Sequence, residues 1–597
     1  MTRGRVRALF AWGLVAGLAS LAWIYVVPFP AVLLSEHNIT STRILDRHGR
    51  GLREVFGAAG GRARWTKLEG VSPWLPLALI HAEDRRFYSH TGVDPIAMVR
   101  SMVYNARLGR VVTGASTITQ QTVKVVMHRG ERRGVALKIE EMAWALRLER
   151  AADKDMILEQ YVNRLPFGNL LFGVGAASRM YLGKAPDRLT LAEAVLLAQI
   201  PSSPSRNTPY ADMERARQRA RALLGVMLER GAISSSQYER ALDEALTIKP
   251  RRGRVIAAHF TEHVHGTLEE SSAPREVHTT LELELQRAVH GIVRQHVTML
   301  QDQHVEQAAA LVVHNPTGEV LAWVGSREYW DEERAGANDG VVALRQPGSV
   351  LKPFVYAMYF DEGGAPFHQV EDREVQFPTE DGAYIPKNYD RRTHGWVSLR
   401  QALGSSLNIP AVVLTERLGA DHVLAKLREA GLTSLDESPE HYGLGVALGN
   451  GEVRMLEVAE AYATLASGGV RRPVSVRKDL SMGPGHRVFS EQAAYMALDV
   501  LRDDFAREIG FGRRSVLDLP FDVAMKTGTS TGYRDNWAVG VTPEYTVAAW
   551  AGNFDGSPMH HTSGIVGAAP IVRQVMQALH PGAANRGSVA WFERPPG

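Results

Sequence analysis

Three short strings in the C-terminal half constrain the fold of this chain more than any other feature, because their chemistry requires them to meet in space. They are S-x-x-K at residues 349–352, S-x-N at residues 406–408 and K-T-G-T-S at residues 526–530. Their order and residue types are typical of active-site serine acyltransferases. Leu407 stands where the usual pattern has Asp, but the Ser and Asn on either side carry the functional atoms. Each string is weak alone, and together they predict an acyl-enzyme mechanism.

The first two strings supply a nucleophile and the groups that move its proton. A serine hydroxyl is a weak nucleophile at its ordinary pKa, so an adjacent base must accept its proton. Lys352 follows Ser349 by three residues, and a helix would place both on one face. Pro353 is compatible with that helix only in its opening turn. Ser406 offers a second hydroxyl that can relay a proton to the leaving group, and Asn408 offers an amide that can hold substrate.

The third string offers charge and backbone to the same reaction. Lys526 is a cation suited to a substrate carboxylate. The small Gly528 would let a substrate backbone lie alongside as an added strand. The backbone N–H groups of Ser349 and Thr529 would then stabilise the oxyanion of the tetrahedral intermediate.

Length and composition limit the kind of protein that carries these strings. At 597 residues the chain exceeds one hydrophobic core, so two or more domains are expected. The net charge of +3 gives no overall field that would favour nucleic acid. The chain has no cysteine, which excludes disulfides, thiolate nucleophiles and cysteine-ligated zinc. A globular, multidomain protein without nucleic-acid partners is predicted.

An apolar run near the N-terminus predicts a membrane anchor. Residues 9–27 carry no charge, and as a helix they would be about 28 Å long, close to the roughly 30 Å hydrocarbon thickness of a bilayer. Arg3, Arg5 and Arg7 precede the run and Glu36 follows it, so the N-terminus should stay in the cytoplasm and the remainder should be exported. A cleaved signal peptide is the alternative, but the run is long for one and no clear A-x-A site follows.

The remainder of the chain changes character near residue 300. Before it, residues 45–250 are predicted to be mainly helical, with capping-box patterns at Thr190 and Ser234 and a buried helix at residues 191–200 closed by Pro201. After it, two strand-like runs flank an N-P-T-G turn, which predicts an antiparallel hairpin. The predicted strands are residues 308–314, 319–325, 523–525, 537–541 and 545–551, and the predicted helices are 349–360 and 453–466.

These patterns predict a multidomain chain whose second large domain is α/β with an antiparallel sheet. The predicted parts are a cytoplasmic tail and transmembrane anchor at 1–30, a mainly α domain at 45–245, a linker region at 246–305 and the α/β domain at 306–580.

The three strings and their surroundings resemble a known family. Residues 348–353 (GSVLKP), 405–410 (SSLNIP) and 526–530 (KTGTS) resemble the transpeptidase domain of class A penicillin-binding proteins. Residues 532–540 (GYRDNWAVG) look most like the 1C branch of that family. The resemblance implies a serine β-lactamase-like fold for the second domain. It also implies a lysozyme-like, mainly α glycosyltransferase domain in the first half.

The first half carries the motifs that this resemblance requires. Residues 83–92 (EDRRFYSHTG) match the family's first glycosyltransferase motif, E-D-R-x-F-x-x-H-x-G, at every specified position. Residues 114–121 (GASTITQQ) with Lys124 resemble the second motif, and residues 154–163 resemble the fourth. The third motif is less faithful, because Leu137 stands where the family usually has Arg. One cation expected near substrate phosphate is missing there, and Arg132 or Arg133 is a candidate to replace it.

The resemblance also implies roles for single residues. Glu83 would be the base that deprotonates an acceptor hydroxyl, and Glu141 would orient the acceptor or help to bind a divalent metal. Lys124 and Lys138 would attract pyrophosphate. The implied catalytic residues are Glu83, Glu141, Ser349, Lys352 and Ser406. The implied substrate-binding residues are Arg85, His90, Ser116, Thr117, Gln120, Gln121, Lys124, Lys138, Asn408, Lys526, Thr527, Gly528 and Thr529. No cofactor is certain, and a divalent cation, Mg²⁺ or Mn²⁺, stays open for the glycosyltransferase.

By resemblance the chain is expected to be a bifunctional peptidoglycan synthase of the cytoplasmic membrane, facing outward. It would polymerise lipid II with inversion at the anomeric carbon and cross-link stem peptides through an acyl-serine intermediate. Its expected partners are lipid II, glycan strands, β-lactams as inhibitors and cell-wall assembly proteins. Two alternatives stay open, namely a D,D-carboxypeptidase or β-lactamase that admits water to the acyl-enzyme, and a β-lactam-binding scaffold with weak or absent glycosyltransferase activity.

Overall fold

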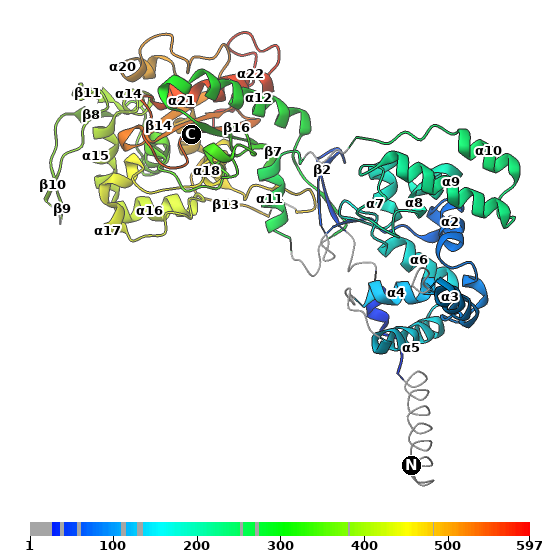
Figure 1. Cartoon of the computed structure of the whole chain (residues 1–597). Coiled ribbons are helices and arrows are strands. Elements are labelled where there is room, and N and C mark those ends of the chain that lie inside the picture. The colour runs from blue at the N-terminus through cyan, green and yellow to red at the C-terminus, as the bar shows by residue number, and fades with distance from the viewer. Residues whose placement is uncertain are drawn as a thin grey trace, which may run out of the picture. The chain divides into compact units, whose positions relative to one another are not determined.

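The chain folds into two compact units. The computed structural model describes residues 27–35, 41–56, 61–108, 115–127, 135–250, 255–268, 274–379, 382–480 and 483–596. The N-terminal unit comprises Met1–Arg43 and Glu54–Arg254, and the C-terminal unit comprises Ile44–Arg53 and Val255–Gly597 (Figure 1). The two units correspond in content to the expected helical half and α/β half.

The predicted membrane anchor at residues 9–27 lies outside the described residues except for its last position. No helix within the described ranges combines the length and the apolar character needed to cross a membrane.

The N-terminal unit is built almost wholly of helices around one apolar core. Helix α2 packs on α8 and α9, and α4 packs on α5 and α6. Both predicted capping boxes are present, at Thr190 before α8 and at Ser234 before α10. All eight residues of α8 are buried, as the apolar run predicted. The main helices are α2 (Trp74–Glu83), α3 (Pro95–Leu108), α4 (Ile118–Val126), α5 (Val135–Ala151), α6 (Lys154–Arg164), α8 (Leu191–Ala198), α9 (Met213–Glu229) and α10 (Ser235–Asp243).

The C-terminal unit is organised by a five-stranded antiparallel sheet of order β14-β15-β16-β6-β7. The predicted N-P-T-G turn joins β6 to β7, with Gly318 at a φ of +64°. The strands of the sheet are β6 (Gln307–His314), β7 (Glu319–Val324), β14 (Ala524–Thr529), β15 (Asp535–Val541) and β16 (Tyr545–Gly552). All five strands therefore lie where alternation and turn signals predicted them, within a few residues.

Helices cover both faces of this sheet (Figure 1). One face of β6, with Ala308, Ala310 and Val312, shares a core with α12 (Leu283–Met299) and α22 (Ala569–Leu579). Because side chains alternate along a strand, the other face points away from these helices and contacts α18 (Met455–Ala466). Helices α13 (Lys352–Asp361) and α19 (Glu491–Arg502) pack against each other, and α19 contacts β14.

The segment expected as a linker is largely folded into the C-terminal unit. Helices α11 (Ala258–Gly266) and α12 belong to that unit. Val289, Val293 and Val297 are fully buried at a spacing of four residues, which forms one apolar stripe against the sheet. A short three-stranded sheet of order β2-β1-β5 joins the hairpin β1 (Thr42–Leu45) and β2 (Gly51–Val55) to β5 (Glu276–His278). The polar surface of α12 is what made this stretch look like a connection.

The burial of α12 predicts the effect of shortening one side chain in its stripe. Val293→Ala removes two buried methyl groups from a fully buried position and should lower the stability of the C-terminal unit by about 2 kcal/mol. Amides of α12 and β7 should then exchange with deuterium about 30-fold faster in the full chain. The exposed neighbour Gln295→Ala should leave these rates unchanged. Equal exchange in the two variants would show that α12 does not stabilise the sheet.

Candidate active sites

The serine of the first string lies at the start of a buried helix. Ser349 belongs to a 3₁₀ turn, η9 (Gly348–Leu351), which continues directly into α13. Pro353 occupies the first turn of α13, where its missing N–H costs no intrahelical bond. Ser349 and Lys352 therefore share the N-terminal end of one helix, as the spacing predicted, and Ser349 is partly open while Lys352 is fully buried.

The Lys352 ammonium is the point at which the first string meets the second. Its Nζ donates to the backbone carbonyl oxygens of Ser406 at 2.6 Å and Leu407 at 3.0 Å, and to Asn408 Oδ1 at 2.7 Å. Burial, followed by the positive charge of Lys526, lowers the pKa of Lys352 well below its usual value. Within the described structure no hydrogen bond joins Lys352 Nζ to Ser349 Oγ, since all three donors point toward the second string.

Lys526 joins the third string to the second. Its Nζ donates to Ser406 Oγ at 2.8 Å and to its neighbour's carbonyl, Thr527 O, at 2.7 Å. Burial lowers the pKa of Lys526 to about 7. Ser406 holds a φ of +61°, a left-handed conformation that is costly for a residue with a side chain. That conformation lets one residue offer its carbonyl to Lys352 and its hydroxyl to Lys526.

Two glycines allow the first and third strings to touch. A Cβ on Gly348, which has a φ of +55°, would lie 2.6 Å from the Thr529 carbonyl oxygen, and a Cβ on Gly528 would lie 2.2 Å from the Pro347 carbonyl oxygen. Both distances are shorter than any real carbon contact, so only glycine fits. The side of Gly528 on which a side chain would point is filled by protein backbone and is not open to a substrate strand. The contact brings the backbone before Ser349 against Thr529, where two N–H groups were expected to face an oxyanion.

The Asn408 amide is held by the protein through both its oxygen and its nitrogen. Its Oδ1 accepts from Lys352, and its Nδ2 donates to the carbonyl of Lys387 at 2.7 Å. Its backbone N–H donates to Asn388 Oδ1 at 2.8 Å, at the first turn of α15 (Asn408–Leu418). The expected substrate amide is thus tied to the loop that contains Asn388.

Asn388 and Asp372 are positioning residues that the sequence patterns did not reveal. Asn388 Nδ2 donates to both carboxylate oxygens of Asp372, at 2.9 and 2.8 Å. Asp372 is fully buried and also accepts from the backbone N–H and Nδ1 of His394. A chain of hydrogen bonds therefore runs from Asp372 through Asn388 and Asn408 to Lys352. The only local signal is an N-Y-D string at 388–390, which reads as an ordinary polar loop.

In the N-terminal unit Glu83 is the last residue of α2 and is half-buried. Its carboxylate accepts from Gln121 Nε2 at 3.0 Å, and Gln121 Oε1 in turn accepts from the Tyr161 hydroxyl at 3.1 Å. Burial, followed by the charges of Glu83 and Asp84, raises the pKa of Tyr161 well above its usual value. The hydroxyl therefore stays protonated and serves as a donor that fixes Gln121 and, through it, the carboxylate.

Several residues of the glycosyltransferase motifs hold the fold beneath Glu83. His90 and Asp84 are both buried, and His90 Nε2 lies 2.9 Å from Asp84 Oδ2. Because Nδ1 of His90 accepts from the Gly92 backbone, Nε2 carries the proton and donates it. Thr117 and Gln120 form a capping box at the start of α4 and are almost fully buried. His90, Thr117 and Gln120, expected to bind substrate, thus bond to other parts of this unit.

A second acidic residue and three cations come from the same glycosyltransferase motifs. Lys138 Nζ donates to Ser116 Oγ at 2.8 Å and forms a close ion pair with Glu141 on the same helix, α5. Lys124 and Arg85 are exposed, and neither forms an ion pair with another residue in the described ranges. No group of three or more His, Asp or Glu side chains suited to a metal ion occurs among the residues that the structure describes. Glu83 and Glu141 alone do not form a complete metal site.

Comparison with known proteins agrees with this pair of sites. Residues 49–228 match the transglycosylase family, and residues 308–577 match the penicillin-binding protein transpeptidase domain. Penicillin-binding protein 1C of Escherichia coli is 34% identical over 98% of this chain and 73% of its own length. The chain is a class A penicillin-binding protein. Penicillin-binding protein 1A of Aquifex aeolicus is 29% identical over 93% of this chain and 88% of its own length.

The fold of this class A penicillin-binding protein is also that of a solved relative. The crystal structure of penicillin-binding protein 1A from Haemophilus influenzae superposes with a TM-score of 0.65 at 18% identity, covering 94% of each chain. With a transglycosylase and a transpeptidase domain in one chain, the protein is a bifunctional peptidoglycan synthase, similar to the 1C branch.

The hydrogen-bond chain from Asp372 predicts that Asn388 controls acylation of this penicillin-binding protein without touching substrate. Asn388→Ala removes the acceptor for Asn408 N–H and frees Asn408 and Lys352 to shift. A displacement near 1 Å at such a site costs about 10²-fold in rate. The second-order rate constant for labelling by fluorescent penicillin should therefore fall about 10²-fold. The exposed Asp436→Asn should keep the wild-type rate, and a wild-type rate in Asn388→Ala would contradict the positioning role.

The buried Lys526 predicts how stability depends on pH. The unfolded chain binds a proton at Lys526 up to pH 10.5, whereas the folded unit releases it near 7, so raising the pH from 7 toward 10.5 favours the folded unit. The gain between pH 7 and pH 8 should be about 1 kcal/mol. This gain should appear in calorimetry as a higher unfolding temperature of the C-terminal unit at pH 8 than at pH 7. Lys526→Met should show a smaller rise, because only the buried Lys352 then adds to it, while Lys478→Met, which changes an exposed lysine, should keep the full rise. A parallel pH dependence in all three proteins would contradict the burial cost of Lys526.

Proposed function

We propose that Ser349 is the acyl-carrying residue of the transpeptidase and that Lys352 is its base. In the neutral form, Lys352 Nζ needs only two of its three present acceptors, and its lone pair can take the Ser349 hydroxyl proton. The lowered pKa of Lys352 supports this form. The observation that carries the proposal is the convergence of all three strings, through Lys352 and Lys526, on the single residue Ser406.

The acylation step then follows from these positions. Ser349 Oγ attacks the carbonyl carbon of the penultimate D-Ala of a stem peptide, and the N–H groups of Ser349 and Thr529 stabilise the oxyanion. As the C–N bond breaks, the Ser406 hydroxyl, hydrogen-bonded to Lys526, gives a proton to the departing D-Ala amine and regains one from Lys352, which thereby passes on the proton taken from Ser349. An amine of a second strand next attacks the ester carbonyl, forms the cross-link and returns the proton to Ser349. A β-lactam would acylate the same oxygen and stay bound.

For the N-terminal unit we propose that Glu83 is the catalytic base of glycosyl transfer. Its carboxylate accepts the proton of an acceptor hydroxyl while that oxygen bonds to the anomeric carbon of lipid-linked donor, with inversion, and polyprenyl pyrophosphate leaves. Gln121 and Tyr161 support the orientation of Glu83. The exposed Lys124 is proposed to attract the pyrophosphate, and Glu141, paired with Lys138, to orient the acceptor.

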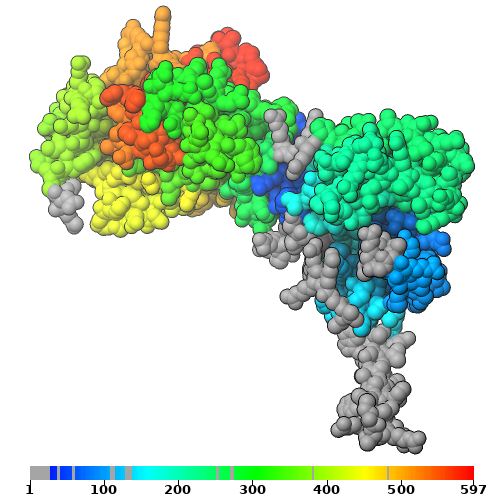
Figure 2. Space-filling view, in the orientation of Figure 1, coloured from blue at the N-terminus to red at the C-terminus, as the bar shows by residue number. Residues whose placement is uncertain are grey.

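We further propose that the domains face outward from the cytoplasmic membrane, anchored by residues 9–27. An apolar surface on α3 supports contact of the N-terminal unit with lipid, since Val99 is 62% and Met102 is 69% exposed. This part of the chain, coloured mid-blue in Figure 2, lies at the surface of the unit. The proposed domain limits are 45–245 for the glycosyltransferase and 306–580 for the transpeptidase. Such an arrangement would keep Glu83 beside a substrate that cannot leave the bilayer.

Two single substitutions test the two reactions separately in the full chain. Glu83→Gln should lower polymer formation from purified lipid II by more than about 10²-fold and leave fluorescent penicillin labelling unchanged. Ser349→Ala should abolish labelling and leave polymer formation intact. Equal polymer yields from Glu83→Gln and wild type would remove the role of Glu83, and a stable adduct on Ser349→Ala would remove that of Ser349. A polymer yield already negligible in the wild type would favour the scaffold alternative that Leu137 raised.

A further inference from the structure

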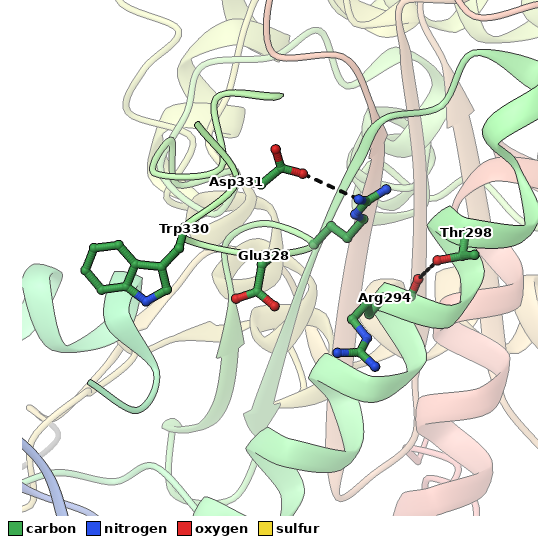
Figure 3. A pocket seen from close by; sticks show the side chains of 6 residues that line it. Arg294, Thr298, Glu328, Trp330 and Asp331 are labelled. Atoms are coloured by element: carbon green, nitrogen blue, oxygen red, sulfur yellow. Dashed lines mark hydrogen bonds and ion pairs between the residues drawn. The ribbon is translucent and has the colours of Figure 1, made fainter. Parts of the chain in front are cut away.

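A hollow lined mainly by charged residues lies in the C-terminal unit, apart from the three strings (Figure 3). Its volume is about 430 Å³. One wall is α12, which contributes Arg294 and Thr298, and the other is the loop after β7, residues 327–331. None of the residues assigned to acylation lines it. The lining residues are Arg294, Thr298, Arg327, Glu328, Trp330 and Asp331.

The hollow is separated from the acylation site by the width of the sheet. Strand β7 is one edge of the five-stranded sheet and β14, which carries Lys526, is the other. Four inter-strand spacings of about 4.8 Å place these edges about 19 Å apart. The hollow therefore cannot hold the group that reacts with Ser349, but it can hold another part of the same polymer.

Opposite charges face this hollow without pairing with each other. Arg294 is exposed and Glu328 is half-exposed. Neither side chain forms an ion pair with another described residue, and Figure 3 draws none between them. Thr298 donates to the Arg294 carbonyl and leaves the guanidinium free. The hollow thus presents one unpaired cation, Arg294, and one unpaired anion, Glu328, among its described lining residues.

Arg327 adds an unsatisfied donor. Its Nη2 contacts Asp331 Oδ2 at 3.4 Å, whereas its Nη1 is buried and has no hydrogen-bond partner among the residues that the structure describes. A buried N–H without an acceptor is costly, so a rotation of the guanidinium that turned this N–H into the hollow would let a ligand acceptor satisfy it. Guanidinium groups match carboxylates particularly well because both are planar forks.

Trp330 supplies an apolar surface beside these charges. Its side chain is 67% exposed, and its ring makes an edge contact with Tyr329 at 4.7 Å between centroids. Indole faces pack against aliphatic chains and attract cations. A ligand that suits the hollow therefore has a carboxylate, an ammonium group and a short aliphatic chain.

We propose that this hollow is an exosite for a zwitterionic amino-acid group carried by the peptides of the cell-wall polymer. The carboxylate of that group binds Arg294 and Arg327, its ammonium binds Glu328, and its carbon chain lies on Trp330. The proposal rests on the proposed function for the identity of the polymer. An occupied exosite would hold one peptide near the β7 edge of the sheet while another reacts at Ser349, near the β14 edge.

Retention of the full chain on insoluble peptidoglycan tests the exosite. Ser349 is first blocked with ampicillin, so that the acylation groove is filled in every sample. Four polymers are compared, namely intact, amine-acetylated, carboxyl-amidated and peptide-free. Arg294→Gln, Glu328→Gln and Trp330→Ala should each weaken retention on intact polymer about tenfold. Arg294→Gln should have no further effect on carboxyl-amidated polymer, nor Glu328→Gln on acetylated polymer, because the matching ligand group is already gone.

Matched controls come from the same unit. Arg287→Gln changes a charged residue two turns earlier on α12, and Trp396→Ala removes an equally exposed indole, at 69%. Both should bind intact polymer like the wild type. Wild-type retention by the three exosite variants would overturn the proposal, and so would a loss of the same size on peptide-free polymer, which would point to sugar recognition. Failure of the acylation assignment would instead appear as absent ampicillin adduct before the polymer is added.

Discussion

The acylation site depends on the burial of two lysines next to each other. Lys352 is fully buried and Lys526 is 2% exposed, with no carboxylate bonded to either within the described structure. Two such charges in an apolar interior would be prohibitive without compensation. Carbonyl oxygens of Ser406, Leu407 and Thr527 provide that compensation. The left-handed turn at Ser406 contributes to this compensation, because it aims the Ser406 carbonyl at Lys352 and the Ser406 hydroxyl at Lys526.

Much of the C-terminal unit could be predicted from its sequence because short local patterns indicate its helices and strands. The strands of the sheet show alternating polar and apolar residues, or unbroken apolar runs, between turn residues. The spacing of the S-x-x-K string indicates the start of a helix. Helix α12 was assigned to a linker because its apolar stripe is narrow and its remaining faces are polar. Asn388 and Asp372 could not be found in this way, since they act through hydrogen bonds to distant residues that no local period encodes.

The glycosyltransferase motifs illustrate a different limit. Glu83 and Gln121 contact each other, and Lys138 pairs with Glu141, so these motif residues interact with one another through their polar groups. Thr117, by contrast, caps a helix. A sequence motif contains residues that bind substrate together with residues that stabilise the backbone beneath them. The motif alone does not distinguish these two kinds of residue, whereas the three-dimensional structure does.

The close backbone contacts around Ser349 restrict how such a protein can become resistant to β-lactams. Any side chain at Gly348 or Gly528 would collide with main-chain atoms, so substitutions there would destroy the site rather than narrow it. Tyr389, which is 67% exposed and adjoins Asn388, carries its hydroxyl 3.4 Å from that of Tyr533. Drug selection would accordingly act on this outer rim, where a changed side chain can exclude a bulky antibiotic and spare the backbone that a natural peptide needs.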